Sequence, residues 1–330
     1  MRKLATALLM GGAFAVPAML STPAQAQTAQ CGDLSIAQMG WASAEIMTEV
    51  AKFLLEQGYG CKVDLVKSDT IPAITSVAEN GEPDIVTDLW LNSAGEAYTK
   101  LEQAGTMVTL THVLDPGGVE GWWLPTYLVE AHPELATIEG VMANPALVGG
   151  RFNNCPEGWG CRVVSDNLVR ALNLPASGIE VFNHGSGETL ASSMGAAVSA
   201  KEPWFGYYWG PTVPLGKYPM TKVKLGEYDA AKFTNLQSPN ATDPQVSEFP
   251  EAPSVTAVTA KLAGEKPEIV EFLKKMTFKT DDMNALLAWQ DDNKASAQEV
   301  AVQYLTTHGA EWSTWLSDDA REKLSALLPQ

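Results

Sequence analysis

The chain has 330 residues, with 22 Lys and Arg against 39 Asp and Glu, and a formal net charge of −17 at pH 7. This excess of acidic residues argues against a partner such as nucleic acid or an anionic membrane surface, and it suits a soluble protein whose ligand carries positive charge. The length is enough for two lobes of ordinary domain size after an N-terminal leader.

The N-terminus has the pattern of a secretion signal. Arg2 and Lys3 precede an apolar stretch over residues 4–20, and the small residues at 24–26 are typical of a cleavage site. We therefore expect residues 1–26 to be a cleavable signal peptide and the mature protein to work in the periplasm. A membrane anchor is the alternative, but the stretch is shorter and more interrupted than the roughly 20 apolar residues of a spanning helix.

Strands and helices alternate along most of the remaining chain. The hydrophobic spacing predicts strands over 34–39, 62–66, 84–89, 107–114, 122–129, 147–152, 179–182, 205–209, 222–225 and 255–259. It predicts helices over 44–55, 71–78, 94–103, 163–172 and 188–200, and mostly helix from residue 267 onward. This alternation predicts an α/β fold with largely parallel sheet and helices on its faces.

A turn over 115–118 is a candidate hinge, and Pro211 with Pro214 interrupts the chain where we expect it to cross back. This predicts that residues 27–114 and 212–330 form one lobe and that residues 115–211 form the other.

The four cysteines favour disulfides in an exported protein. Three pairings are possible, and we prefer the local one, Cys31 with Cys61 and Cys155 with Cys161. A zinc site is the competing interpretation, but the sequence has no CxxC pair and its four histidines are scattered. We therefore expect neither a metal ion nor a cofactor. Lipid attachment at Cys31 is not expected, because the residues before it lack the usual context.

Four tryptophans lie where ligands bind in α/β proteins. Trp41, Trp90 and Trp209 each stand where a strand meets a loop, and Trp159 lies in the short Cys155–Cys161 loop. Strand ends are the usual ligand-binding edge of open α/β sheets. A quaternary ammonium group has no N–H to donate, so several electron-rich ring faces are the natural way to bind it. Core packing is the alternative for each ring taken alone.

Further candidates surround these rings. Trp122 and Trp123 are adjacent on a predicted strand, so only one of them can face the cleft. Glu120 shares the face of Trp122 and can accept from a hydroxyl or, when protonated, donate to an oxide; the alternative is a solvated acid. The backbone amides of Gly160 and Cys161 open a predicted helix and suit an anionic group. Together with the ring cage, such a site fits a zwitterion with a methylated nitrogen and a carboxylate.

Over nearly its whole mature length the chain resembles the substrate-binding proteins of glycine betaine/choline-type ABC importers. The resemblance is carried by the Cys155–Cys161 loop with Trp159, by the motif at 207–211 and by the motif at 88–90. It implies a two-lobe periplasmic binding protein fold of type II, with a hinge on which the lobes close, and delivery of ligand to a membrane permease and its ATPase. It also implies an aromatic box of Trp90, Trp159 and Trp209, with the amides of Gly160 and Cys161 holding a carboxylate.

In choline-binding relatives, the rings lie at the position of Trp41 and near Trp122. The sequence departs from both patterns, because Asn92, Ser93 and Ala94 stand where some betaine binders have a histidine, and Ser43 stands where choline binders have an acid.

The ligand we expect is glycine betaine. Trimethylamine N-oxide, choline, carnitine, proline betaine and dimethylsulfoniopropionate stay open, because a cage of rings recognises the methylated cation more than its tail. Two other classes are a periplasmic enzyme and a receptor that presents ligand to a sensor kinase. The sequence has no GxSxG, HExxH, GxGxxG or P-loop motif. We therefore expect a monomeric binding protein that is not an enzyme.

Overall fold

The fold comes from a computed structural model that describes residues 31–327. The predicted signal peptide, residues 1–26, lies outside the described residues. Within the described part, no helix is both long enough and apolar enough to cross a membrane.

The first lobe is built on a five-stranded sheet with the order β2-β1-β3-β11-β4. Its strands are β1 (Gly32–Met39), β2 (Cys61–Ser68), β3 (Ile85–Trp90), β4 (Met107–His112) and β11 (Ser254–Thr259). β1 runs parallel to both β2 and β3, whereas β11 runs antiparallel to β3 and β4. Every residue of β3 is buried, because helices cover both faces of the sheet. The sheet is therefore mixed, with one antiparallel strand among parallel ones.

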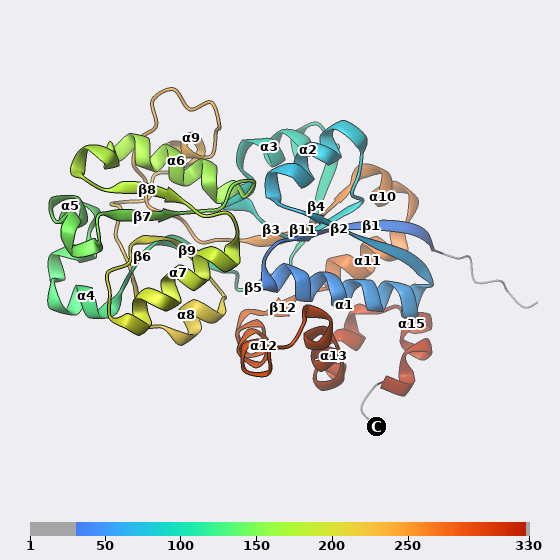
Figure 1. The fold of residues 1–330 in the computed structure, drawn as a ribbon. Helices are drawn as coiled ribbons and strands as arrows, with labels where there is room; N and C mark the ends of the chain where they lie inside the picture. Colours follow the sequence, from blue (N-terminus) through green and yellow to red (C-terminus); the bar gives the residue numbers. More distant parts are fainter. Residues whose placement is uncertain (1–30, 328–330) are drawn as a thin grey trace, which may run out of the picture. The chain divides into compact units, whose positions relative to one another are not determined.

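Helices cover the two faces of this sheet (Figure 1). α1 (Ala42–Tyr59) lies along one face, and α2 (Thr70–Asn80) and α3 (Leu91–Gln103) lie along the other. α1 buries Ile46, Val50 and Leu54 at helical spacing and ends at Gly60, whose φ of 70° is left-handed. The C-terminal region adds α10 (Ala260–Glu265), α11 (Pro267–Lys275), α12 (Thr280–Asn293), α13 (Ala297–Thr307), α14 (Gly309–Trp312) and α15 (Asp318–Lys323).

The second lobe is built on another five-stranded sheet, with the order β10-β6-β9-β7-β8. Its strands are β6 (Val119–Pro125), β7 (Arg151–Asn154), β8 (Glu180–Asn183), β9 (Gly206–Gly210) and β10 (Met220–Lys222). Its helices are α4 (Thr126–Ala131), α5 (Ile138–Ala143), α6 (Gly160–Leu172), α7 (Gly187–Ala200), α8 (Val213–Lys217) and α9 (Ala230–Leu236). Figure 1 shows α6 and α9 on one side of this sheet and α7 and α8 on the other.

Short elements complete the chain. β5 (Leu114–Asp115) pairs with β12 (Phe278–Lys279), and five 3₁₀ turns cover Pro133–Ala136, Pro145–Val148, Leu174–Ser177, Ser313–Trp315 and Ser325–Leu327. Each lobe thus has a mixed sheet between helices, as expected for a type II periplasmic binding protein.

The chain passes between the two sheets at residues 116–118 and again near 250–253. The two passages pair with each other through Gly118 and Ala252. The sequence predicted that the chain re-enters the first lobe after Pro211. In the structure β10 pairs with β6, so residues 220–222 still belong to the second sheet. The predicted strand over 122–129 is also wrong at its end, since α4 begins at Thr126.

Candidate functional site

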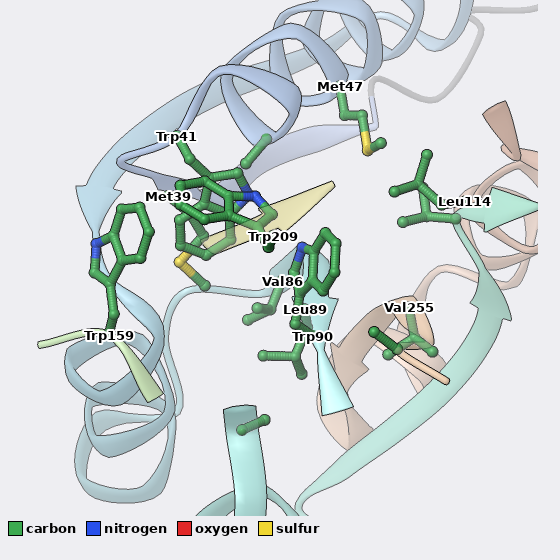
Figure 2. Close-up of a cluster of buried hydrophobic side chains, with 14 of the residues drawn as sticks. Met39, Trp41, Met47, Val86, Leu89, Trp90, Leu114, Trp159, Trp209 and Val255 are labelled. Atoms are coloured by element: carbon green, nitrogen blue, oxygen red, sulfur yellow. The ribbon is translucent and has the colours of Figure 1, made fainter. Parts of the chain in front are cut away.

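One cavity between the two sheets gathers nearly all of the predicted site residues. Its lining residues are Trp41, Thr70, Trp90, Ser93, Glu120, Trp159, Gly160, Cys161, Tyr207 and Trp209. Seven of the eight predicted ligand-binding residues are among them, and Trp122 is the exception. We call Trp41, Trp90, Trp159 and Trp209 the tryptophan cage; Figure 2 shows their rings gathered at one place. The cavity volume is about 20 Å³, which is room for about one water molecule.

Three of the four cage tryptophans stand at the start of a helix. Trp41, Trp90 and Trp159 are the N-caps of α1, α3 and α6, and none of them makes a side-chain capping bond. Helix starts normally prefer Ser, Thr, Asp or Asn, and losing such a cap costs about 0.5–2 kcal/mol. Three helix N-termini therefore converge on the cavity, and their free amides and positive dipole ends favour an electron-rich group of the ligand.

The cage rings meet nearly at right angles. The Trp159 centroid lies 5.1 Å from that of Trp41, at 68°, and 5.0 Å from that of Trp209, at 78°. Behind Trp209, the ring of Tyr208 stacks at 4.7 Å. Edge-to-face contacts of this kind hold neighbouring rings at an angle to one another, and all four rings line one cavity, where a methylated cation can meet their faces.

Buried or half-buried acids hold two of the rings. The indole Nε1 of Trp41 donates to Asp88 Oδ2 at 2.8 Å, and Nε1 of Trp159 donates to Asp69 Oδ1 at 2.8 Å. Asp88 is fully buried and also accepts from the hydroxyls of Ser43 and Ser254. Burial raises the pKa of Asp88, and these hydrogen bonds oppose that rise. Both carboxylate oxygens of Asp88 therefore accept hydrogen bonds, and one of these bonds holds the ring of Trp41.

Glu120 is the polar group of the cavity. Its side chain is 1% exposed, and Oε1 accepts from Tyr207 Oη at 2.7 Å and from Ser93 Oγ at 2.8 Å. Oε2 is buried and has no hydrogen-bond partner. Burial raises the pKa of Glu120, and the hydrogen bonds from Tyr207 and Ser93 lower it by less. The solvated-acid alternative is therefore wrong, because the carboxyl lies inside the cavity with one oxygen free.

Trp122 is a core residue of the second lobe and not a wall of the cavity. Its side chain is fully buried, its ring lies 4.2 Å from Phe152 and 5.6 Å from Phe205, and Nε1 donates to Ser165 Oγ on α6. Glu120 and Trp122 are two residues apart on β6 and so share one face, as predicted. Trp122 lies about 7 Å further along the strand, which takes it under α6 and away from the sheet edge.

Trp123 faces another part of the molecule. It lines a separate groove of about 980 Å³ beside α8 and α12, and its Nε1 donates to the Tyr208 carbonyl. Neither member of the adjacent pair therefore contributes to the tryptophan cage. His184 is also structural, since its Nε2 lies 3.1 Å from Asn153 Oδ1 in the second lobe.

Sequence reasoning missed three lining residues: Thr70, Ser93 and Tyr207. Tyr207 could have been predicted, because it lies two residues before Trp209 on β9 and its side chain is therefore on the same face of the strand as that of Trp209. Ser93 comes from the first lobe and Glu120 from the second, so their hydrogen bond depends on how the lobes meet. No local pattern signals such a contact.

The cysteines form the two local disulfides that we preferred, Cys31–Cys61 and Cys155–Cys161. No thiol is left to bind zinc, since all four are paired. Away from the cavity, Asp282, His308 and Glu311 bring their ligand atoms within 4.8 Å of one another. All three side chains are partly buried, and their proximity alone does not establish a metal site.

Comparison with solved structures reveals the same fold at low identity. The glycine betaine/L-proline-binding protein ProX of Borrelia burgdorferi has a TM-score of 0.73 at 15% identity, covering 88% of this chain and 99% of that one. Lactococcal OpuAC in a closed conformation with glycine betaine has a TM-score of 0.69 at 20% identity, covering 87% and 100%. A choline-binding protein of an ABC transporter, in complex with choline, has a TM-score of 0.72 at 16% identity, covering 90% and 98%. No curated protein matches the chain by sequence.

The family comparison is more specific than the structural one. A family described as the substrate binding domain of ABC-type glycine betaine transport systems matches residues 32–307. That match spans both sheets, the Cys155–Cys161 disulfide and every residue that lines the cavity. Members of this family are binding proteins and not enzymes. The chain therefore belongs to the substrate-binding proteins of glycine betaine-type ABC transport systems.

Proposed function

We propose that this protein captures trimethylamine N-oxide in the periplasm and delivers it, as a monomer, to the permease and ATPase of an ABC importer. Family membership makes it an extracytoplasmic substrate-binding protein for quaternary ammonium compounds. The choice among those compounds rests on Glu120. Glycine betaine, the ligand expected from the sequence alone, is the second candidate, and the relatives that bind glycine betaine or choline show that the fold serves both.

The free oxygen of Glu120 is the observation that carries the proposal. Both hydrogen bonds to this carboxyl fall on Oε1, so a proton on the carboxyl has its place on Oε2, which is buried without a hydrogen-bond partner. A buried donor without an acceptor costs about 1–3 kcal/mol. An N-oxide oxygen beside the methylated nitrogen supplies the missing acceptor, while the tryptophan cage faces the methyl groups.

The size of the cavity and the charges around it also favour trimethylamine N-oxide. No Lys or Arg is among the described residues that line the cavity, so a carboxylate such as that of betaine has no cationic side chain to pair with. The N-oxide is the smallest of the candidate ligands, so the two lobes have to part least around it to enlarge a cavity of about 20 Å³. Choline is the reverse case, because its hydroxyl would donate to Glu120 and would require the ionised carboxylate.

The test is calorimetric titration of the parent protein against trimethylamine N-oxide, glycine betaine, choline, carnitine and dimethylsulfoniopropionate across pH. Because burial raises the pKa of Glu120, the donor is present below that raised pKa and is lost as pH rises through it. Affinity for the N-oxide should fall over that interval, whereas affinity for choline should rise.

Two variants make the test sharper. Glu120→Gln keeps a neutral donor at the same place, so it should bind the N-oxide within about threefold of the parent but without the pH dependence. Glu120→Ala should weaken binding about tenfold or more, the cost of one buried hydrogen bond. Equal affinity of Glu120→Ala and the parent, or tighter binding of betaine than of the N-oxide at every pH, would refute the ligand assignment.

A further inference from the structure

Trp159 belongs to the second lobe but is held by the first. It lies in the Cys155–Cys161 loop at the start of α6, and its Nε1 donates to Asp69 Oδ1 at 2.8 Å. Asp69 stands between β2 and α2 of the first lobe. In Figure 2 the indole nitrogen of Trp159 points away from the other cage rings, so this hydrogen bond acts on the outer edge of the cage.

Asp69 is not used as an ordinary helix cap. It is the N-cap residue of α2, a position where Asp normally accepts from the first amides of its own helix, yet it makes no such bond. One of those amides, Ile71 N–H, instead donates to the carbonyl of Gly158 at 3.1 Å. The start of α2 therefore makes two hydrogen bonds to the loop of the other lobe, one to the Trp159 ring and one to the backbone beside it.

Gly158 makes this approach possible. Its φ of +86° is left-handed, and a Cβ added there would lie 3.2 Å from Asp69 Oδ2. The disulfide Cys155–Cys161 closes the loop over a sequence separation of six, which limits how far Trp159 can move by itself. The loop thus presents Trp159 as a restrained unit to the start of α2.

The position of Trp159 decides whether the cage is complete. Its ring is the one that contacts both Trp41 of the first lobe and Trp209 of the second. We infer that Asp69, together with the first turn of α2, is a positioning residue that fixes Trp159 as a cage wall only when the two lobes are together. Asp69 does not line the cavity and acts through the ring. This inference rests on the proposed function, in that the cage is taken to hold the ligand.

A positioning residue of this kind controls release more than capture. The ligand meets the open lobes before the Asp69–Trp159 bond forms, so the association rate should not depend on the bond. Dissociation requires the bond to break. Asp69→Ala should therefore raise the dissociation rate about tenfold, as expected for one charge-assisted hydrogen bond, with an association rate within about twofold of the parent.

The experiment is stopped-flow binding of trimethylamine N-oxide and glycine betaine to the full mature protein and five variants. Asp69→Asn retains a side-chain oxygen that can accept from the indole, and it should keep the dissociation rate within about threefold. Asp64→Ala is the matched control, because it removes an exposed carboxylate from β2, the strand that leads to Asp69, and should change neither rate.

Trp159→Phe, alone and with Asp69→Ala, completes a double-mutant cycle. Removing Asp69 should have little effect once the indole N–H is gone. A parental dissociation rate for Asp69→Ala, or the same cost of Asp69→Ala in both backgrounds, would overturn the inference.

A second readout separates this inference from the ligand assignment. The indole N–H of Trp159 gives its own NMR signal, which Trp159→Phe identifies. Asp69→Ala should shift that signal and speed its exchange with solvent, and Asp69→Asn should preserve it. If trimethylamine N-oxide does not bind but another candidate ligand does, the ligand assignment fails while this signal, recorded with that ligand bound, still tests the contact. An unchanged signal in ligand-bound Asp69→Ala would refute the contact whatever the ligand.

Discussion

The most informative single substitution is Trp209→Leu, which removes a ring from the tryptophan cage but keeps an apolar side chain. Trp209 lies on β9, is 7% exposed, and contacts Trp159 at a centroid distance of 5.0 Å. Loss of a desolvated cation–π contact costs about 0.5–2 kcal/mol, and loss of the ring–ring contact that holds Trp159 costs about 0.5–1.5 kcal/mol. Together these amount to about 1–3.5 kcal/mol and predict a Kd about 5- to 350-fold higher.

The assay is calorimetric titration of trimethylamine N-oxide into the parent, Trp209→Leu and Trp209→Phe. Phe retains a smaller ring and should give an intermediate affinity, since the effect follows the π-face and not the apolar volume. Trp289→Leu is the matched control, because this tryptophan lies on α12 outside the cavity. Thermal unfolding of each variant checks that the fold is intact. If Trp209→Leu binds within about twofold of the parent, the rings do not hold the ligand and the reasoning fails.

Three more variants distinguish the residues that form or hold the tryptophan cage from those that stabilise the fold. Trp122→Ala should lower the free energy of unfolding, measured with denaturant, by about 3–5 kcal/mol. Its Kd for the ligand, measured by titration, should change less than about threefold. A large loss of affinity with unchanged stability would show that Trp122 belongs to the ligand site. Replacing Cys155 and Cys161 by Ser should weaken ligand binding about tenfold, because the loop that carries Trp159 is released. Replacing Cys31 and Cys61 by Ser should instead lower the free energy of unfolding by about 2–4 kcal/mol at an unchanged Kd. Weaker binding in this variant, with unchanged binding when Cys155 and Cys161 are replaced, would contradict the account.

Local sequence patterns predicted the elements that position the cage. Trp41, Trp90 and Trp209 lie at strand ends, and Trp159 is confined by a short disulfide loop, so each could be placed from its neighbours in the chain. Their convergence on one cavity follows from the strand-end rule of α/β folds. The lining role of Tyr207 follows from the two-residue period of β9.

Other features depend on contacts between distant segments. The strand period puts Glu120 and Trp122 on one face, but only the packing of α6 against β6 sends one into the cavity and the other into the core. β10 joins the second sheet by pairing with β6, across nearly a hundred residues, and no signal near Pro211 predicts that pairing. The Asp69–Trp159 hydrogen bond joins residues 90 positions apart. From the sequence around it, Asp69 would be predicted to be an ordinary helix N-cap.

The most direct measurement of the central claim is a crystal structure of the protein grown with trimethylamine N-oxide. The account predicts the methylated nitrogen among the rings of Trp41, Trp90, Trp159 and Trp209, with the oxide oxygen about 2.5–2.8 Å from Glu120 Oε2. A ligand bound outside these four rings, or an oxide turned away from Glu120, would contradict it.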